Sequence, residues 1–336
     1  MTKPQTTAQS RKSSGEGRTG PLPGLATYIP GHAPAGAFSG SGEGVAWRRE
    51  HVFPEPSFPF AILDIPRHPE LGLHTHQGFS ELVVVYAGRA MHVTTEERYP
   101  IGPGDVFVIS GESAHGYADV DDLYLANVVF EDARFLRGIG EIKRLPGFHA
   151  LFRLEPRYRR QHWFESRLRL APDELDHLLT LLERMSRVYT ARQPGYELRT
   201  RMAFLEVVCY LCDRYVGAKN PASRSLLLMD NVIQYLENNY AEPVSLATLA
   251  EQAHMSERNL LLLFRDATGL SPIEYLIRVR IAHACELLRA TDRSITEVAH
   301  AAGFLDSNYF SRQFKRFTGM RPSEYRERFT LRPVLE

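Results

Sequence analysis

Residues 245–270 read SLATLAEQAHMSERNLLLLFRDATGL, and residues 295–320 read ITEVAHAAGFLDSNYFSRQFKRFTGM. Both stretches follow one plan, in which a short amphipathic helix and a turn lead to a second helix that ends before Thr-Gly. Ser256 and Asp306 can each cap the second helix, because a side-chain oxygen accepts from free N–H groups of a first helical turn. Each glycine stands where a helix C-terminus favours a residue with positive φ. The two stretches predict consecutive helix-turn-helix motifs, whose second helices can enter major grooves.

The local charge of the chain bears on how such motifs would bind DNA. The 40 basic residues are balanced by 40 acidic ones, so the chain as a whole carries no excess charge for a polyanion. Between residues 307 and 328, six basic residues stand against two acidic ones, whereas five stand against eight between residues 226 and 290. Because phosphate contacts supply much of the affinity for DNA, we expect the second motif to make most of them.

The stretch from Met229 to Phe329 resembles the DNA-binding domain of the AraC/XylS family of bacterial transcription regulators. Residues 301–327, AAGFLDSNYFSRQFKRFTGMRPSEYRE, carry the most specific part of the resemblance. Residues 275–288, YLIRVRIAHACELL, match the long helix that joins the two motifs in that family. The resemblance covers about a third of the chain. It implies sequence-specific binding to double-stranded DNA and activation of transcription through RNA polymerase.

The second helix of the second motif offers the richer set of DNA-reading side chains. Its aromatic residues, Tyr309, Phe310, Phe314 and Phe317, are expected to face the core. Arg312 is placed for a bidentate contact to guanine and Asn308 for a pair with adenine, whereas the other cations suit phosphates. The side chains predicted to face the DNA are Ser307, Asn308, Ser311, Arg312, Lys315 and Arg316.

The corresponding helix of the first motif carries four consecutive leucines, residues 260–263. A helix cannot bury four consecutive residues along one narrow stripe, so Leu261 or Leu262 should face the DNA. In the family that the chain resembles, an arginine that touches bases stands at the position of Leu262. A leucine can contact thymine methyl groups but cannot donate a hydrogen bond. We therefore expect the second motif to dominate recognition, with Arg258, Leu262 and Arg265 as the contacts of the first.

A β-rich region with a distinct polar pattern precedes the helical half of the chain. From Trp47 to Phe130, short runs of β-forming residues are separated by glycine and proline, which predicts a small sandwich or barrel. His74 and His76 are followed by Glu81, and His115 comes later, after a Gly-Asp pair. This spacing resembles the two motifs of the cupin superfamily, a small β-barrel. In metal-binding cupins, two histidines, a glutamate and a later histidine are the metal ligands.

These four side chains leave three interpretations open. Three imidazoles and a carboxylate suit Fe, Mn, Zn, Ni or Cu, so His74, His76, Glu81 and His115 can form a metal site. The same groups can hydrogen-bond the hydroxyl groups of a small organic effector, as in sensor cupins fused to AraC-type domains, which typically bind a sugar. They can also be polar residues without a ligand role. We expect the effector pocket, with no cofactor required and a divalent metal as the alternative.

Two further observations concern the effector. Ser110 stands where proline is usual in the second cupin motif and Glu112 where glycine is usual, which puts the loop before the later histidine in question. The run from Leu145 to Arg159, with the helices that follow it, resembles the rhamnose-regulator branch of the family. That resemblance implies a sugar or sugar acid as the effector.

Two amphipathic helices, residues 172–190 and 195–216, are predicted between the β region and the motifs. The apolar stripe of the first is Leu175, Leu178, Leu179, Leu182 and Met185. The apolar stripe of the second is Leu198, Met202, Leu205, Val208 and Cys209. Cys209 and Cys212 lie one turn apart and are interpreted as small core residues, and with Cys285 they offer no disulfide framework. We expect these helices to couple the domains and to form a homodimer seam.

We predict an α+β multidomain chain, with an N-terminal cupin-like β-barrel with flanking helices and a C-terminal all-α domain with two helix-turn-helix motifs. Residues 1–45, rich in glycine, serine and proline, should form a disordered leader. A cupin-like effector-binding barrel (46–135) and a helical coupling and dimerisation segment (136–217) follow. A linker (218–225) then leads to the AraC-type DNA-binding domain (226–330).

The function predicted from these motifs is that of a sequence-specific DNA-binding transcription regulator, an activator and not an enzyme, which responds to a small-molecule effector. The alternative is a metal-dependent cupin enzyme or a metal-sensing regulator. No apolar run approaches the roughly 20 residues of a membrane-spanning helix, and no signal-peptide pattern opens the chain. We therefore expect a cytoplasmic protein without a membrane partner.

Overall fold

The computed structural model describes residues 26–27, 45–110, 113–136, 139–158, 167–218 and 220–329. The expected leader lies outside the described residues except for Ala26, Thr27 and Val45, and so do Glu112 and Arg159. The strands are β1 (Ala26–Thr27), β2 (Val45–Trp47), β3 (Phe60–Ile65), β4 (Leu71–His76), β5 (Ser80–Thr94), β6 (Arg98–Ile101), β7 (Asp105–Ser110), β8 (His115–Phe130) and β9 (Leu168–Arg169).

Two short helices lie near the sheet, and after β8 most of the described residues are helical. The helices up to residue 216 are α1 (Arg49–Val52), α2 (Asp132–Phe135), η2 (Gly140–Arg144), η3 (Ala150–Leu154), α3 (Glu155–Tyr158), α4 (Pro172–Ala191) and α5 (Tyr196–Val216). The C-terminal half has α6 (Pro221–Asn238), α7 (Leu246–Gln252), α8 (Glu257–Thr268), α9 (Pro272–Ala290), α10 (Ile295–Ala301), α11 (Ser307–Thr318) and α12 (Pro322–Phe329). Within the described ranges, no helix combines the length and the apolar content that a bilayer crossing requires.

A long antiparallel ribbon of β5 and β8 organises the sheet. The first half of β5 pairs with β7 and its second half with β6, while β8 pairs with β4 near its start and with β3 near its end. Register shifts in the middle of the ribbon separate the two halves, so each half has its own neighbours. The register sets His74 of β4 directly opposite His115 of β8.

The predicted fold class is confirmed, with one difference in the β domain. A β-rich N-terminal domain with flanking helices precedes an all-helical C-terminal domain. The pairings of the described strands run from β1 through β3, β8, β5 and β7 to β9 and leave the sheet open, whereas a barrel was expected. The two ends of this order, β1 and β9, are strands of two residues each, and no pairing among the described strands joins one to the other.

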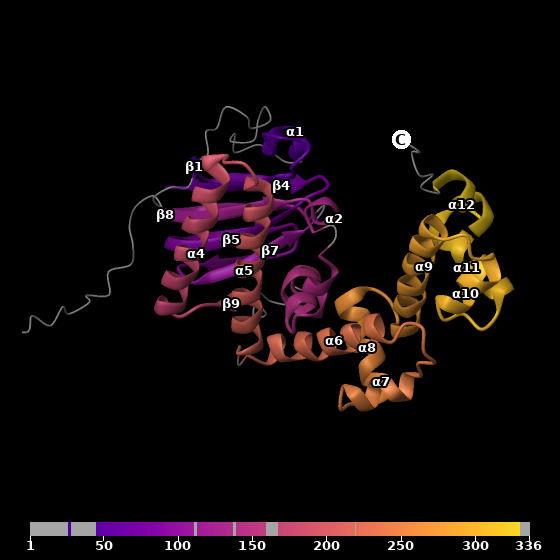
Figure 1. Cartoon of the computed structure of the whole chain (residues 1–336). Helices are drawn as coiled ribbons and strands as arrows, with labels where there is room; N and C mark the ends of the chain where they lie inside the picture. Colours follow the sequence, from indigo (N-terminus) through magenta and orange to yellow (C-terminus); the bar gives the residue numbers. More distant parts are fainter. Residues whose placement is uncertain are drawn as a thin grey trace, which may run out of the picture.

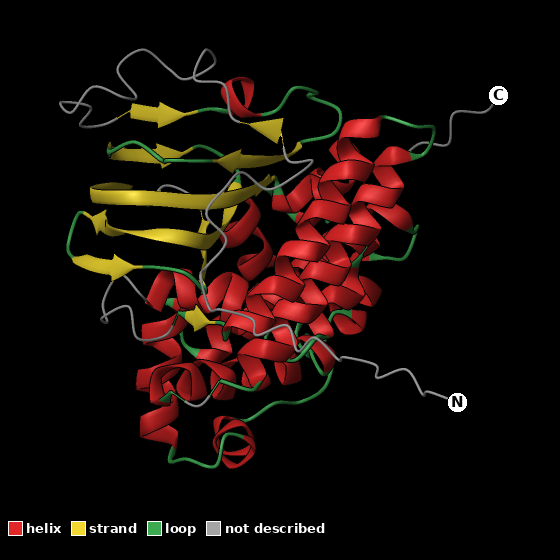
Figure 2. Cartoon of the chain, turned by 90° about the vertical axis from the view of Figure 1, so that its left-hand side faces the viewer, coloured by secondary structure: helices red, strands yellow, loops and turns green. Residues whose placement is uncertain are grey.

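Helices α4 and α5 lie side by side over the sheet (Figures 1 and 2). The stripe predicted for α4 is buried, since all five of its predicted apolar residues lie in the main core. The stripe predicted for α5 is partly wrong: Val208 is buried, but Leu198 and Met202 are 65% and 62% exposed. Cys209 is exposed as well, while Cys212 is buried as expected. The face of α5 that packs against the sheet and α4 is instead the one that carries Phe204. The ring of Phe204 contacts those of Phe60 and Phe130.

The C-terminal half contains both predicted helix-turn-helix motifs, α7–α8 and α10–α11, joined by α9. The predicted caps are present, since Ser256 accepts a hydrogen bond from the backbone N–H of Asn259 and Asp306 from that of Tyr309. Gly269 and Gly319 both have positive φ at the helix ends. Helix α6 starts at Pro221, inside the stretch predicted as a linker, because the Asn220 side chain caps it and proline suits its first turn.

The two helix-turn-helix motifs belong to different hydrophobic clusters. One continuous cluster joins the sheet, α4 and α5 to the first motif, from Phe58 in the β domain to Leu260 and Leu276 in α8 and α9. The second motif has its own cluster with the far end of α9, around Phe310 and Phe314. In Figure 1, α10–α12 accordingly lie at the far end of α9, away from the sheet.

A buried carboxylate ties the β domain to α6. Asp230 is fully buried and accepts hydrogen bonds from the backbone N–H groups of Gly147, His149 and Ala150, at 2.8, 2.9 and 3.3 Å. Gln234 donates to the same carboxylate at 2.9 Å. Gly147 adopts a φ of +86°, which favours glycine, so that its backbone fits close against the end of α5. Burial raises the pKa of Asp230 and its hydrogen bonds oppose that shift.

We expect Asp230→Ala to lower the free energy of unfolding by at least about 3 kcal/mol, because it leaves several buried donors without a partner. Urea denaturation followed by circular dichroism measures the loss. Asp213→Ala, at an exposed position of α5, is the matched control and should change stability by less than about 0.5 kcal/mol. Equal small effects from both variants would contradict a structural role for Asp230.

Candidate DNA interface and candidate effector site

The second helix of the second motif, α11, presents a polar face with cations. Asn308, Arg312, Lys315 and Arg316 are exposed. Ser307 and Ser311 are half-buried, and the Ser311 hydroxyl donates to the carbonyl of Ser307 at 2.9 Å. This internal hydrogen bond occupies the Ser311 donor, so of the predicted residues the amide and the three cations are the freest to reach DNA.

The aromatic residues of α11 divide differently from the prediction. Phe310 and Phe314 are buried and Phe317 is half-buried, as expected, but Tyr309 is 38% exposed. Its ring lies 6.0 Å from the guanidinium carbon of Arg312, so the ring can hold that cation on the outer face. Tyr309 therefore belongs to the surface that carries Arg312, and its placement in the core was wrong.

The first motif exposes apolar side chains on its second helix, α8. Leu260 is fully buried, whereas Leu262 is 60% exposed and Leu261 also faces solvent. Arg258 and Arg265 are exposed beside them. The expectation that one of the two middle leucines points outward is confirmed, and both do.

One exposed residue of this half was missed. Leu305, in the turn before α11, is 89% exposed. Nothing in the neighbouring sequence indicated this exposure, because an apolar residue immediately before an N-cap, here Asp306, usually packs back onto its helix. Its side chain extends the surface of the second motif beyond the face of α11.

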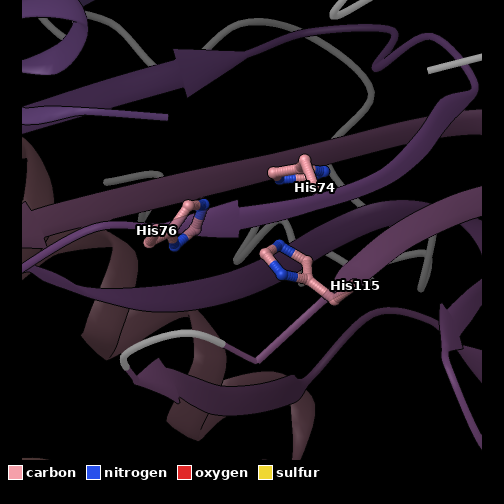
Figure 3. A group of neighbouring side chains, drawn as sticks. All are labelled: His74, His76 and His115. Carbon is pink, nitrogen blue, oxygen red and sulfur yellow. The ribbon is translucent and has the colours of Figure 1, made fainter. Parts of the chain in front are cut away.

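The four polar residues predicted in the β domain lie together. His74 and His76 come from β4, Glu81 from the start of β5 and His115 from the start of β8. Figure 3 shows the three imidazoles turned toward one another, and one nitrogen from each lies within 4.8 Å of the others. The Nε2 atoms of His76 and His115 each lie 3.7 Å from Oε2 of Glu81. His115 reaches this cluster although the loop before it departs from the cupin pattern.

Hydrogen bonds around the cluster leave ring nitrogens facing inward. Nδ1 of His74 lies 3.0 Å from the carbonyl of Gly72, and Nδ1 of His115 lies 3.4 Å from that of Ser113. An imidazole that donates from Nδ1 to a carbonyl keeps Nε2 as an acceptor. Among the described residues, Nε2 of His115 and Nδ1 of His76 are buried without a hydrogen-bond partner.

Burial keeps the cluster neutral. It lowers the pKa of His74 to about 4 and those of His76 and His115 well below the ordinary value, with neighbouring histidines adding to the last two shifts. Burial also raises the pKa of Glu81 to about 8, although Asn127 donates a hydrogen bond to its carboxylate and opposes the shift. Neutral imidazoles beside a carboxyl group can ligate a divalent transition metal or hydrogen-bond hydroxyl groups. The donor set therefore fits both of the chemistries predicted for it.

Two side chains of this region were missed. The buried imidazole of His92, on β5, stacks against that of His115 with ring centroids 5.4 Å apart. The amide of Asn127, on β8, holds Glu81. A polar residue within an apolar run of its strand (AMHV at residues 90–93 and LYLANVVF at residues 123–130) was the only signal for either, because their partners are distant in the sequence.

Comparison with known proteins identifies two regions of the chain. Residues 64–201 match the sequence profile of the AraC-like ligand binding domain, and residues 249–328 that of a helix-turn-helix domain. The chain is 34% identical over 269 residues to the HTH-type transcriptional activator RhaR of Salmonella schwarzengrund (strain CVM19633), covering 79% of this chain and 91% of the relative. The RhaR protein of Salmonella typhimurium is similar to the same extent.

Solved structures give weaker matches. The apo structure of a ToxT variant from Vibrio cholerae strain SCE256 is 15% identical and covers 81% of this chain and 98% of that one, with a TM-score of 0.32. The DNA-binding domain of AdpA in complex with a target DNA is 34% identical and covers 32% of this chain and 97% of that one, with a TM-score of 0.30. At these scores the structural likeness carries no argument, and the relationship rests on the sequence relatives.

We expect the metal-free protein, kept in a chelator, to lose stability as the pH falls from about 6.5 toward 4. The unfolded histidines bind protons in that range, whereas the buried ones do not. Glu81 acts in the opposite direction, because its pKa is raised from 4.5 to about 8 in the folded state. Its contribution to stability is fully present below the ordinary carboxyl pKa and is lost as the pH rises toward 8.

Urea denaturation between pH 5 and 8.5 separates the two contributions. Glu81→Gln should remove the decline between pH 6.5 and 8, up to about 1.4 kcal/mol per pH unit, and keep the acid-side decline. Glu50→Gln, at an exposed position, is the control. Identical alkaline slopes for Glu81→Gln and the unaltered protein would contradict the raised pKa.

Proposed function

We propose that this chain, which belongs to the AraC family of transcriptional regulators, activates transcription when a sugar binds in its β domain. The observation that carries the proposal is the continuous core between that domain and the first helix-turn-helix motif. Such a core gives a ligand in the β domain a physical route to one of the two DNA-reading helices. The 34% identity to the activator RhaR supports activation as the sign of the response.

We propose that α8 and α11 enter successive major grooves of a direct-repeat operator. Arg312 and Asn308 would read bases, while Lys315 and Arg316 would bind phosphates, with Ser307 and Ser311 alongside them. In the first motif, Arg258 and Arg265 would contact phosphates and Leu262 a thymine methyl group. The six-to-two basic excess at residues 307–328 supports a dominant second motif.

In the β domain, we propose that His74, His76, Glu81 and His115 belong to the effector site. Their buried nitrogens and carboxyl group suit sugar hydroxyl groups, and no cofactor is needed for this role. A metal-sensing regulator is the second candidate, because unpartnered ring nitrogens beside a carboxyl group also suit a divalent transition metal. If a metal is bound, these four side chains would hold it, and the ion would supply a Lewis acid.

The proposal includes two protein partners and a location. As an activator, the protein would act through RNA polymerase. It would encounter the polymerase and the DNA in the cytoplasm. A homodimer seam is proposed along α5, where Leu198 and Met202 are exposed one turn apart and Cys209 continues the stripe. The effector must bind the DNA-competent arrangement more tightly than the other, because equal affinity would shift no population.

The DNA part of the proposal is tested on an operator selected from a random DNA pool with the purified protein. At fixed salt, Arg312→Ala should weaken operator binding at least about tenfold, as expected for loss of a bidentate base contact. Arg258→Ala should weaken it by less than about threefold, because a single phosphate contact positions the protein without specifying a base. Arg187→Ala, at an exposed position of α4, controls for the loss of a cation. Equal losses from Arg312→Ala and Arg258→Ala would contradict the asymmetric mode of recognition.

The effector part is tested by thermal denaturation with sugars, sugar acids and divalent metals, each with and without chelator. A ligand at a hundredfold excess over its dissociation constant stabilises the folded state by about 2.7 kcal/mol. We expect stabilisation by a sugar such as L-rhamnose that chelator does not alter. Stabilisation by a metal alone, abolished by chelator, would replace the sugar sensor with the metal sensor.

A further inference from the structure

A cavity of about 210 Å³ lies beside the histidine cluster and touches it only at His115. Its walls come from the end of β5 and the start of β6, from the end of β7, and from Pro156 of α3. His92 also lines the cavity, and its ring stacks on that of His115. The cavity therefore adjoins the proposed effector site at His115 and has one wall outside the sheet.

The chemistry of the walls points to one class of ligand. Residues with hydroxyl groups, among them Thr95, Tyr99 and Ser110, line the cavity, and His92 and Tyr99 contribute aromatic rings to its walls. Among the described residues of the lining, Glu96 alone carries a formal charge, so an anionic ligand would meet a like charge there. The volume is below the roughly 300–1,000 Å³ of sites for drug-sized ligands. These features suit a neutral polyhydroxylated molecule of monosaccharide size.

The wall formed by α3 connects the cavity to the first helix-turn-helix motif. Arg157, the next residue after Pro156, places its guanidinium against Gly269 at the C-terminus of α8, so closely that a Cβ at Gly269 would overlap it. A cation is favourable at that position, because the free carbonyls of a helix end carry a partial negative charge. Helix α3 continues from η3, whose first turn is held by the buried Asp230. A displacement of Pro156 would therefore be passed directly to the end of α8.

We propose that the effector binds in this cavity and that it is a neutral polyhydroxylated molecule rather than a sugar acid. Binding of the ligand displaces α3, and Arg157 transmits that displacement to α8. The proposal rests on the proposed sugar-sensing function and makes it specific. It assigns the ligand to one side of the histidine cluster, with His115 as the shared residue. It also makes the first motif, which has the weaker DNA-reading surface, the motif that responds to the ligand.

The ligand class and the location are tested with matched pairs of a sugar and its acid, such as L-rhamnose with L-rhamnonate and D-galactose with D-galactonate. Thermal denaturation identifies the stabilising member, and calorimetric titration then measures its affinity. Pro156→Trp fills the cavity from α3 and Ser110→Leu fills it from the sheet, so one variant remains informative if the other folds poorly. Each should weaken binding of the neutral sugar at least about tenfold, the loss expected when about 1.4 kcal/mol of contact is removed. Pro146→Trp, exposed in the same interdomain segment, should leave it unchanged.

The outcomes separate the site from the function. Unaltered affinity in both cavity variants would overturn the site while the sugar sensor stands. Stabilisation by the acids alone would overturn the neutral ligand class and make the effector a sugar acid. If no sugar or acid stabilises the protein, the sugar-sensing function itself is wrong.

The coupling is tested with Arg157→Ala. This variant should bind the sugar with unchanged affinity, but its operator affinity should no longer respond to the sugar. The unaltered protein should show a change within the roughly 5- to 150-fold range of typical allosteric coupling. Arg187→Ala is the matched control, with an intact response. A response of Arg157→Ala equal to that of the control would overturn the role of α3.

Discussion

The carboxylate of Asp230 is the constraint on which the arrangement of the two halves depends. It lies on α6, at the entrance to the DNA-binding half, and accepts from three backbone N–H groups at the start of the segment that leads to α3. A buried carboxylate is tolerated only with such a full set of donors, so the segment and the helix must stay together. Nearby, Tyr275 of α9 donates to Glu237 of α6, whose other oxygen lies 3.6 Å from Nε2 of His149. Polar contacts thus join the segment before α3 to α6, and α6 to α9.

This junction gives the two helix-turn-helix motifs different roles. The first shares its core with the sheet and its covering helices, while the second has its core with the far end of α9 and also lies, at Gly303, against Tyr240 and Ala241. The first motif has exposed leucines and an acidic surrounding sequence, which suit it poorly to phosphate and base contacts. The second motif has the excess of basic side chains, six against two acidic ones at residues 307–328. Recognition and response to a ligand can therefore be divided between the motifs, because each is built into a different part of the molecule.

The histidine cluster shows how the sheet creates a neutral polar environment. Residues from β4, β5 and β8 meet because the β5–β8 ribbon sets its neighbours in register, with His74 opposite His115. Burial then disfavours charge on every member, so the imidazoles stay neutral and the Glu81 carboxyl tends to keep its proton. Neutral polar groups without partners are costly in an interior unless a ligand satisfies them. The cavity next to His115 provides the adjoining space for such a ligand.

Features that depend on neighbours along the chain could be predicted from the sequence. Both helix-turn-helix motifs, their caps at Ser256 and Asp306, and the stripe of α4 follow from spacing and capping within a few residues. The convergence of His74, His76, Glu81 and His115 was also predictable, through the resemblance to cupins. Tertiary structure alone decided which face of α5 is buried, that Tyr309 is exposed, that the sheet stays open and that α3 touches α8. The physical reason is that an amphipathic pattern states which residues can be buried, whereas the partner that covers them comes from a distant part of the chain. Helix α5 has apolar residues on two faces, and the face that is buried carries Phe204, whose ring contacts those of Phe60, Phe130 and Phe135.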